Sequence, residues 1–326
     1  MQKPIGDNVS TTGLKISLMN TLDRLFDLAQ ISGSVDIHCL LQGEWNIRHN
    51  EQQRGQGRLH IVVAGTGTIH VDGANTEQVN SEQVSAGDII FFPRAAAHNI
   101  SSTSRYCPVN ISSVLTSHEG AFQVKRVGQE TIDMELFCGR FSYSTHSDLF
   151  SGLPDYIKIR SDTTSLNHLV RLLQAEAQNA HEGSSSIVNA LSTVLLVLII
   201  RQYLAHAEPS VETGFLRAWQ DARLKPVVQA VIESPHSTWS VETLAELAKV
   251  SRAQFMRLFK QETGISPHVF VTQIRLQQAA KLLRTTSQSV LSIALSVGMQ
   301  SETHFGKLFK KYYGVTPGIY RQQGSH

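Results

Sequence analysis

The chain has 326 residues, which is long for one hydrophobic core and sufficient for two or three domains. With 41% hydrophobic and 17% charged residues, its composition is typical of a soluble globular protein. The net charge of +2 hides an uneven distribution, because residues 223–326 carry 13 Lys and Arg against 5 Asp and Glu, whereas residues 1–222 carry 16 against 22. A basic C-terminal third on an acidic body predicts a polyanion-binding module joined to a separate partner domain.

The cysteines and the N-terminal sequence indicate the cellular setting. Cys39, Cys107 and Cys138 are too few and too scattered for a disulfide scaffold or a paired-cysteine zinc site, so a reduced cytosol is the expected setting. The first twenty residues lack the apolar segment and the cleavage site of a signal peptide. The longest apolar run, Val194–Ile200, is far shorter than the roughly 20 residues that cross a bilayer. We therefore expect a cytoplasmic protein with no membrane partner.

The N-terminal half is predicted to be mainly β. Residues 1–30 are expected to form a loose arm and a short amphipathic helix over Leu22–Ala29. From residue 31 to 160, short β-branched or aromatic runs are separated by Gly, Asn, Asp and Ser turns, as in LHIVVAGTGTIHVDG (Leu59–Gly73). This pattern predicts an all-β sandwich or barrel. Alternating apolar residues are candidates for its lining: Trp45, Ile47, Ile61, Val63, Ile90 and Phe92.

Residues 161–222 are predicted to form a helical dimerisation region followed by a linker. Helical spacing of leucines covers Ser165–Ala180, and a second helix begins at Ser184. The second helix is apolar around most of its circumference, so it must be covered by the β domain or by a second copy of itself. Leu195, at its centre, is expected at the dimer contact. The polar stretch Ala205–Phe215 predicts the linker.

The last domain, residues 223–326, contains a repeat with an offset of 50 residues. The matched pairs are Ser251 and Ser301, Phe255 and Phe305, Leu258 and Leu308, Phe259 and Phe309, Lys260 and Lys310, Gly264 and Gly314, and Pro267 and Pro317. Each copy predicts two helices joined by a tight turn, a helix-turn-helix unit whose second helix can enter a major groove about 12 Å wide. A longer helix after Ser266 is expected to hold the copies at a fixed separation. One chain would then read two groove segments roughly 34 Å apart.

Positions that face away from the apolar stripe of each second helix are the candidate DNA contacts. They are Arg252, Ala253, Met256, Arg257 and Lys260 in the first copy, and Glu302, Thr303, Gly306, Lys307 and Lys310 in the second. Arg can donate two hydrogen bonds to guanine O6 and N7, whereas Lys260, Lys310 and Lys311 are expected to hold phosphates. Gly306 costs about 1 kcal/mol of helix stability relative to Ala and would permit close backbone approach. The predicted partner is double-stranded DNA with two adjacent major-groove half-sites.

The same region resembles the AraC/XylS family of bacterial transcription regulators. The resemblance covers about the last hundred residues, at positions that include Leu244–Ala245, Phe255, Arg257, Gly264, Ser266–Pro267, Ile293–Ala294, Gly298, Phe305, Gly314, Thr316–Pro317 and Tyr320–Arg321. Met299 departs from the family, which usually has Phe after Gly298, and both residues fill a core pocket. The resemblance implies a transcription regulator, an activator rather than a repressor, with RNA polymerase as a partner.

The β region resembles a cupin barrel, the sensor half of many AraC-type regulators. Gly87–His98 fits the second cupin motif except for one glycine, and His98 stands at that motif's metal-binding position. In the first motif, His60 fits the first His, but Val62 and Thr66 replace the second His and the Glu. The chain therefore keeps two of four potential metal ligands, which disfavours a dioxygenase or isomerase.

Three interpretations of the sensor site stay open. His60 and His98 can be buried residues that form hydrogen bonds within the barrel. Together with Cys39 and Cys107 they can form a redox-active cysteine pair or a soft-metal site, while Cys138 is expected to pack in the core. A third possibility is an apolar pocket for a small-molecule effector. The N-terminal pattern also resembles regulators that respond to oxidants or to hydrophobic toxic compounds.

The sequence thus predicts an α+β multidomain protein. An N-terminal cupin-like β-barrel with dimerisation helices precedes a C-terminal all-α domain with two helix-turn-helix units joined by a long helix. The predicted function is that of a homodimeric regulator responding to a small molecule, a hydrophobic compound, an oxidant or a metal. One alternative is a cupin enzyme fused to a helical domain, which the missing ligands disfavour. Another is a structural nucleoid binder, which would not need a sensory barrel.

Overall fold

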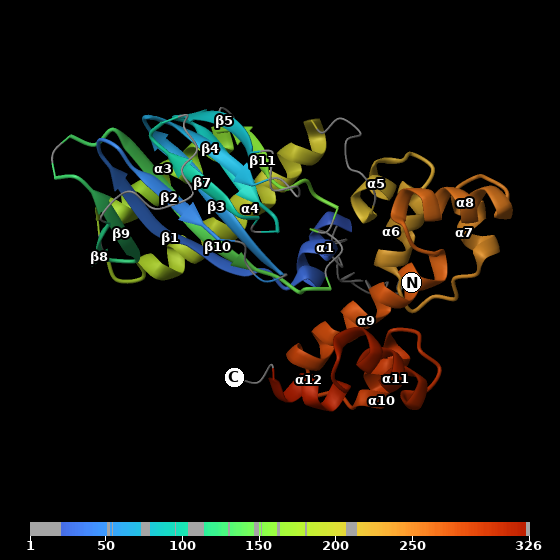
Figure 1. The fold of residues 1–326 in the computed structure, drawn as a ribbon. Coiled ribbons are helices and arrows are strands. Elements are labelled where there is room, and N and C mark those ends of the chain that lie inside the picture. Colours follow the sequence, from blue (N-terminus) through green and yellow to red (C-terminus); the bar gives the residue numbers. More distant parts are fainter. Residues whose placement is uncertain are drawn as a thin grey trace, which may run out of the picture.

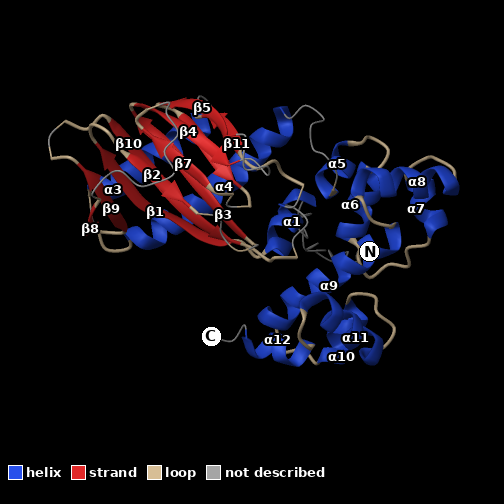
Figure 2. Cartoon of the chain, in the orientation of Figure 1, coloured by secondary structure: helices blue, strands red, loops and turns tan. Residues whose placement is uncertain are grey.

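The computed structural model describes residues 21–323, apart from 51–52, 54, 73–78, 95, 104–113, 130, 147–149, 151, 162–163, 180 and 207–213. A β-rich N-terminal part precedes an all-helical C-terminal part, which confirms the predicted α+β architecture (Figures 1 and 2). The first helix, α1 (Thr21–Ala29), lies between the two parts (Figure 1).

Two sheets build the N-terminal part and enclose a core between them. The large sheet has the strand order β11-β6-β3-β10-β1-β9-β8, and the small sheet has the order β2-β7-β4-β5. Neighbouring strands are antiparallel, except that β1 and β9 run parallel. The strands are β1 (Ser32–Leu41), β2 (Asn46–His49), β3 (Gln56–Ala64), β4 (Thr66–Asp72), β5 (Val79–Ser85), β6 (Asp88–Phe92), β7 (His98–Ser101), β8 (Leu115–Glu119), β9 (Phe122–Val127), β10 (Met134–Ser142) and β11 (Ile157–Arg160).

Alternation along the strands divides the side chains of the large sheet between two cores. In β3, Leu59 and Ile61 pack into the cluster shared with the helices, whereas His60 and Val62 lie between the sheets. Ile61 and Val63 therefore do not line the barrel, contrary to the sequence prediction, because they point to the same face of β3 as Leu59. The other predicted lining residues do belong to the inner cluster: Trp45, Ile47, Ile90 and Phe92.

Two helices, α3 (Thr164–Gln178) and α4 (Ser184–His206), cover the outer face of the large sheet (Figure 2). An irregularity in the pairing of β1 with β10 leaves Val35 outside the ladder, and its backbone N–H donates instead to Ser192 Oγ of α4 at 2.8 Å. Buried backbone donors need such a partner. This hydrogen bond and the apolar packing around it fix α4 against the sheet.

By length and composition, α4 is the one helix in the described part of the chain that could cross a membrane. Its buried residues include Val188, Leu196 and Ile199, which fill the core between helix and sheet. This packing explains the apolar composition of the helix. Leu195 has an exposed fraction of 0%, so the prediction that it lies at a dimer contact is wrong. It faces the core of its own chain.

The C-terminal part is entirely helical. Its helices are α5 (Phe215–Gln220), α6 (Lys225–Glu233), α7 (Val241–Leu247), α8 (Arg252–Thr263), α9 (Pro267–Thr285), α10 (Val290–Ser296), α11 (Glu302–Tyr313) and α12 (Pro317–Gln323). Helix α5 contacts α6 and α8. Residues 215–220, which the sequence placed with the linker region, thus pack with the C-terminal helices.

The pairs α7–α8 and α10–α11 form two helix-turn-helix units with the same local chemistry. A serine hydroxyl caps the start of each helix by accepting the backbone N–H three residues later: Ser240, Ser251, Ser289 and Ser301. Gly264 and Gly314 end α8 and α11 in the left-handed conformation, with φ values of 78° and 79°. The repeat in the sequence is therefore a structural duplication.

Helix α9 contributes to the cores of both units. Phe255 and Phe259 of α8 pack with Phe270 of α9, whereas Phe305 and Phe309 of α11 lie in the cluster that holds the second half of α9. All four α8 and α11 phenylalanines have an exposed fraction of 0%. Because one continuous helix is shared by two apolar cores, the units are held at a fixed separation, as predicted.

Polar contacts join the N-terminal part to the C-terminal helices. Asp27 of α1 forms an ion pair with Lys281 of α9. The backbone oxygen of His146 accepts hydrogen bonds from Gln277 Nε2 at 2.6 Å and from the Tyr312 hydroxyl at 3.2 Å. The sequence assigned α1 to a terminal arm and gave no sign of this contact, which depends on residues more than a hundred positions apart.

Candidate nucleic-acid interface and sensor site

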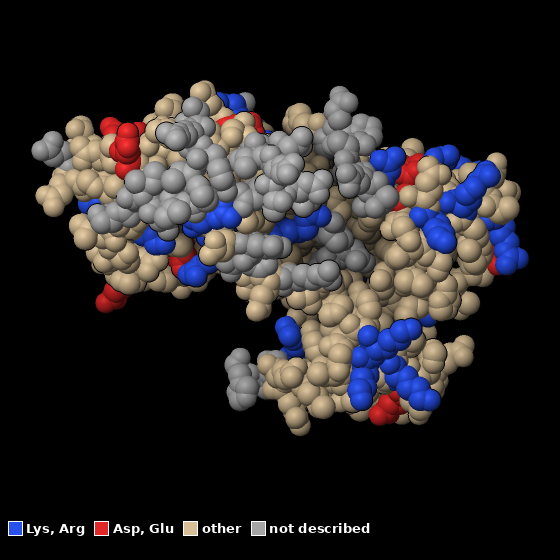
Figure 3. Space-filling model, viewed as in Figure 1, with Lys and Arg blue, Asp and Glu red and all other residues tan. Residues whose placement is uncertain are grey.

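The outward faces of α8 and α11 carry the ten predicted DNA contacts. Gly306 is half-buried and the other nine are exposed: Arg252, Ala253, Met256, Arg257, Lys260, Glu302, Thr303, Lys307 and Lys310. Their exposure follows from the orientation of the helices, since Phe255 and Phe305 point into the two cores. Figure 3 shows Lys and Arg side chains gathered over both helix-turn-helix units on the same face of the molecule.

The cations on this face are largely available for an outside partner. Arg252 Nη1 lies 3.1 Å from Glu242 Oε1, but both side chains are exposed, and such pairs contribute little. Among the described residues, no acidic group lies within ion-pair distance of Arg257, Lys307 or Lys310. Phosphate groups could therefore approach these cations without displacing an internal partner.

His304 and Gly306 of α11 also bear on this surface. His304 is exposed at the position equivalent to Gln254, but Gln254 closes a capping box with Ser251, whereas the His304 side chain has no such role. The sequence prediction omitted His304, although its place on the outer helix face could have identified it. A Cβ at Gly306 would meet no atom within 4 Å, so packing within the protein does not require glycine there.

The predicted sensor residues His60 and His98 meet between the two sheets and are joined by a third imidazole. One ring nitrogen of each of His49, His60 and His98 lies within 4.8 Å of the others. The Nε2 atoms of His60 and His98 are 2.9 Å apart. The sequence missed His49, because only the pairing of β2 with β7 places it opposite His98. The cluster draws on three strands of two sheets.

A pair of thiols adjoins the histidines. Cys138 Sγ lies 3.0 Å from His60 Nδ1 and 4.0 Å from Cys39 Sγ. Cys138 packs in the inner core, as the sequence predicted, and it is also the neighbour of Cys39. Cys107, the predicted partner of Cys39, lies outside the described residues. The pairing of β3 with β10 places Cys138 opposite His60, which sequence periodicity does not reveal.

Burial dominates the electrostatics of this site. Desolvation, reinforced by neighbouring imidazoles and Arg58, lowers the pKa of both His49 and His60 well below the ordinary value of 6.5. Both rings are therefore neutral at physiological pH. The hydrogen bond between the thiols lowers the pKa of Cys39, whereas the same bond and burial raise the pKa of Cys138. Cys39 is thus the more acidic thiol.

The usual cupin ligand set is only half present. Val62 is buried and apolar at the second His position, and Thr66 replaces the Glu at the start of β4. Those two residues cannot supply an imidazole or a carboxylate. The described residues that fit a metal ion at this place are instead three imidazoles, with His49 entering from β2.

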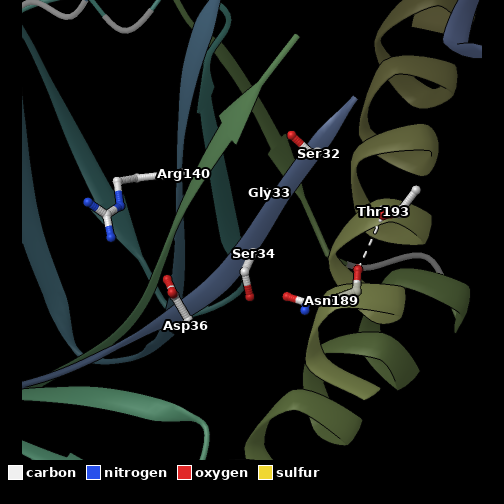
Figure 4. Close-up of a pocket in the computed structure, with 7 residues that line it drawn as sticks. All are labelled: Ser32, Gly33, Ser34, Asp36, Arg140, Asn189 and Thr193. Carbon is white, nitrogen blue, oxygen red and sulfur yellow. Dashed lines mark hydrogen bonds between the residues drawn. The ribbon is translucent and has the colours of Figure 1, made fainter. Parts of the chain in front are cut away.

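Two cavities adjoin the sensor region. A cavity of about 30 Å³ beside the thiols is lined by Cys39, His49, Arg58, Lys125 and Cys138, among others. Pockets for drug-sized ligands usually measure about 300–1,000 Å³, so a drug-sized effector does not fit in this cavity. A larger polar groove lies outside the barrel between β1 and α4, where Asp36, Arg140 and Asn189 are among its lining residues (Figure 4).

The chain resembles known proteins over nearly its whole length. A cupin family model matches residues 20–205, and a helix-turn-helix domain model matches residues 244–323. The chain is 46% identical over 306 residues to the HTH-type transcriptional regulator MtrA of Neisseria gonorrhoeae, covering 94% of this chain and 99% of that protein. It is 40% identical over 309 residues to an uncharacterized HTH-type transcriptional regulator of Haemophilus influenzae, covering 94% and 100%.

A more distant relative also matches this chain over nearly its whole length. The chain is 26% identical over 305 residues to the RCS-specific HTH-type transcriptional activator RclR of Escherichia coli, covering 94% of this chain and 98% of that protein. Because these matches span a cupin domain followed by two helix-turn-helix units, the chain belongs to the AraC family of HTH-type transcriptional regulators with an N-terminal cupin domain.

Proposed function

We propose that this protein activates transcription by laying α8 and α11 into two successive major grooves of one operator. The observation that supports this most directly is the duplicated, exposed and basic outer surface of the two helices, mounted on the single helix α9. Two recognition helices held at a fixed separation are the arrangement that reads half-sites one helical turn, about 34 Å, apart. RNA polymerase would be the partner of an activator bound in this way.

The side chains on this surface divide by chemistry. Arg252 and Arg257 can each take guanine O6 and N7, and Met256 offers an apolar contact to a thymine methyl group. Lys260 and Lys310, together with Lys311, are placed toward the later turns of their helices and would hold phosphates. The remaining proposed contacts are Ala253, Glu302, Thr303, Gly306 and Lys307.

Substitution of Arg257 tests this assignment. A genome-wide binding map supplies the operators, and footprinting with the strongest of them compares the wild type, Arg257→Ala and Arg171→Ala. Arg171 is exposed on α3, far from α8 in sequence, and serves as the control. We expect Arg257→Ala to weaken binding by about 1–3 kcal/mol and to relax one base position, whereas Arg171→Ala should have no effect. An unchanged footprint would remove Arg257 from the proposed contacts.

A homodimer through α4 is the proposed assembly. The exposed side of α4 carries Ile187 and Val194, with exposed fractions of 44% and 47%, and the half-buried Leu191 and Leu198 lie between and beyond them. Spacings of four, three and four residues form the apolar seam of a coiled coil. A second copy of the same seam would cover it, and the dimer would present four groove-reading helices.

The cupin domain is proposed as the input of this regulator, with the cytoplasm as its setting. The site that could receive a signal comprises His49, His60 and His98 beside Cys39 and Cys138. We favour a regulator over a cupin enzyme because Val62 and Thr66 replace two metal-binding residues of the family. The enclosed space of about 30 Å³ beside the site also leaves little room for an organic substrate.

A further inference from the structure

His49, His60 and His98 form the one group of three or more potential metal donors found in the described part of the chain. They come from β2, β3 and β7, so separate strands of two sheets direct them to one point. His60 and His98 are fully buried, with exposed fractions of 0%. Zn–N bonds are about 2.0–2.1 Å long, so two nitrogens that share one ion lie at most about 4.2 Å apart. The donor atoms, which lie within 4.8 Å of one another, would close on an ion by a small rotation of the rings.

Partners behind the rings orient them. His98 Nδ1 lies 2.7 Å from the backbone oxygen of Ala96, which can only accept, so the proton of the neutral ring is on Nδ1 and the lone pair is on Nε2. This Nε2 is the atom that faces His60. Cys138 Sγ contacts His60 Nδ1 from behind. Because His60 Nε2 donates to His98 Nε2 in the ion-free protein, the thiol donates to Nδ1, and an ion at Nε2 would reverse this hydrogen bond. Such outer partners are characteristic of metal-binding histidines. Phe92 stacks on His98 at 3.7 Å and limits its rotation.

Arg58 opposes a cation at this place. Its guanidinium contacts His49 Nδ1, and because a guanidinium can only donate, it occupies the lone pair of that nitrogen. Arg58 is half-buried and also lines the small cavity beside the site. An ion bound through His49 Nδ1 would have to displace Arg58, and its affinity would be lowered by the nearby positive charge.

The donor set selects the class of ion. Three imidazole nitrogens suit zinc and copper ions, whereas Mg²⁺ and Ca²⁺ require oxygen ligands. No described carboxylate belongs to the group. We propose that His49, His60 and His98 bind one Zn²⁺ or Cu⁺ ion as an input signal of the cupin domain. That the ion acts as a signal rests on the proposed regulatory function. The site also differs from the usual cupin metal site, because His49 belongs to neither cupin motif.

Cobalt titration of the metal-stripped full-length protein tests the site. Co²⁺ substitutes for Zn²⁺, and the intensity of its visible d–d bands reports a four-coordinate site. We expect saturation at one ion per chain, displacement by Zn²⁺ and by Cu⁺, and no intense sulfur-to-cobalt band, because Cys138 lies behind His60. His60→Gln and His98→Gln should each lower affinity by more than about 100-fold, beyond the roughly 10–100-fold typical of losing an outer partner.

Two further variants separate metal binding from folding. His70→Gln is the matched control, because His70 is buried in the same β domain but contacts Ser81 and Ser101 outside the cluster, and it should bind Co²⁺ like the wild type. Arg58→Gln should bind Co²⁺ more tightly, by about tenfold or more, since a positive charge is removed. If misfolding were the cause of lower affinity, all variants would bind Co²⁺ less tightly, and Arg58→Gln would not bind it more tightly.

Three results would overturn the proposal. They are equal Co²⁺ binding by the wild type and His98→Gln, no binding by wild type and Arg58→Gln alike, or an intense sulfur-to-cobalt band. The histidines would then be a purely hydrogen-bonded cluster or part of a different site. Footprinting of the same samples without metal tests DNA binding separately, so failure of the metal site and failure of the proposed DNA-binding function can be told apart.

Discussion

Single residues show that the two helix-turn-helix units differ in backbone strain. In the turn of the second unit, Gly298 has a φ of 85°, and a Cβ there would lie 2.7 Å from the backbone oxygen of His236. The corresponding turn of the first unit places Lys249 at a φ of 55°. A residue with a Cβ is strained in this left-handed region, by roughly 1–2 kcal/mol. The first unit thus carries a strain that glycine removes from the second.

Replacement of Lys249 should therefore stabilise the C-terminal helices. We expect Lys249→Gly to raise the free energy of unfolding by about 1 kcal/mol, because relief of strain exceeds the entropy cost of glycine. Gly298→Ala, the converse change, should destabilise by more than about 1 kcal/mol, since it adds both strain and a clash. Urea unfolding of both variants measures the change. A destabilised Lys249→Gly would show that the lysine side chain contributes more than the turn costs.

At the scale of elements, α4 has two apolar sides with different tasks. Leu195 packs against the sheet with no exposed surface, whereas its neighbour Val194 points outward with 47% exposed. The sequence could not separate these sides because the helix is apolar around most of its circumference. Contact with β1 and the hydrogen bond from Val35 to Ser192 determine which side is inside.

Charge substitutions along α4 distinguish these tasks. Val194→Glu should yield a folded monomer in light scattering, because the charge interrupts an apolar seam without entering the core. Leu195→Glu should instead lower stability by several kcal/mol, since a carboxylate would be buried without a partner. Ser185→Glu, exposed near the start of the same helix, is the control and should remain dimeric. A monomeric wild type would contradict the proposed dimer.

For the whole molecule, the contact between the β domain and the second helix-turn-helix unit would link the proposed input domain to a proposed DNA-binding helix. His146 packs against the rings of Tyr312 and Tyr313, with centroid separations of 4.7 and 4.6 Å, and its backbone binds Gln277. Arg284 lines a groove at this contact together with His146 and Tyr313. Because Tyr312 and Tyr313 belong to α11, a shift of the β domain would be transmitted to a helix that is proposed to read a major groove.

Acidification should weaken this contact. Burial lowers the pKa of His146 below its ordinary value, although a hydrogen bond with Tyr312 partly offsets the effect. The separated state therefore binds protons more readily than the docked state. The contribution of His146 is fully present above about pH 6.5 and is lost as the pH falls below that value. Small-angle scattering should show expansion between about pH 7.5 and 5.5, and His146→Gln should reduce it. Equal expansion in both proteins would exclude His146 as the cause.

The sequence by itself determined the C-terminal architecture and the class of protein. The repeat at an offset of 50 residues, the capping serines and the terminal glycines are local signals, because hydrogen bonds within one or two helical turns define them. The outer surfaces of α8 and α11 followed from helical periodicity alone. The β-rich character of residues 31–160 followed in the same way from alternation and turn residues.

Only the tertiary structure decided what the sensor site contains, which side of α4 is free and where α1 packs. His60 lies 38 residues from His98 and 78 from Cys138, and strand register, not local pattern, brings these side chains together. A shift of one residue in the pairing of β2 with β7 would turn His49 to the opposite face. Local periodicity specifies which residues share a face, whereas contacts across sheets depend on the packing of the whole chain.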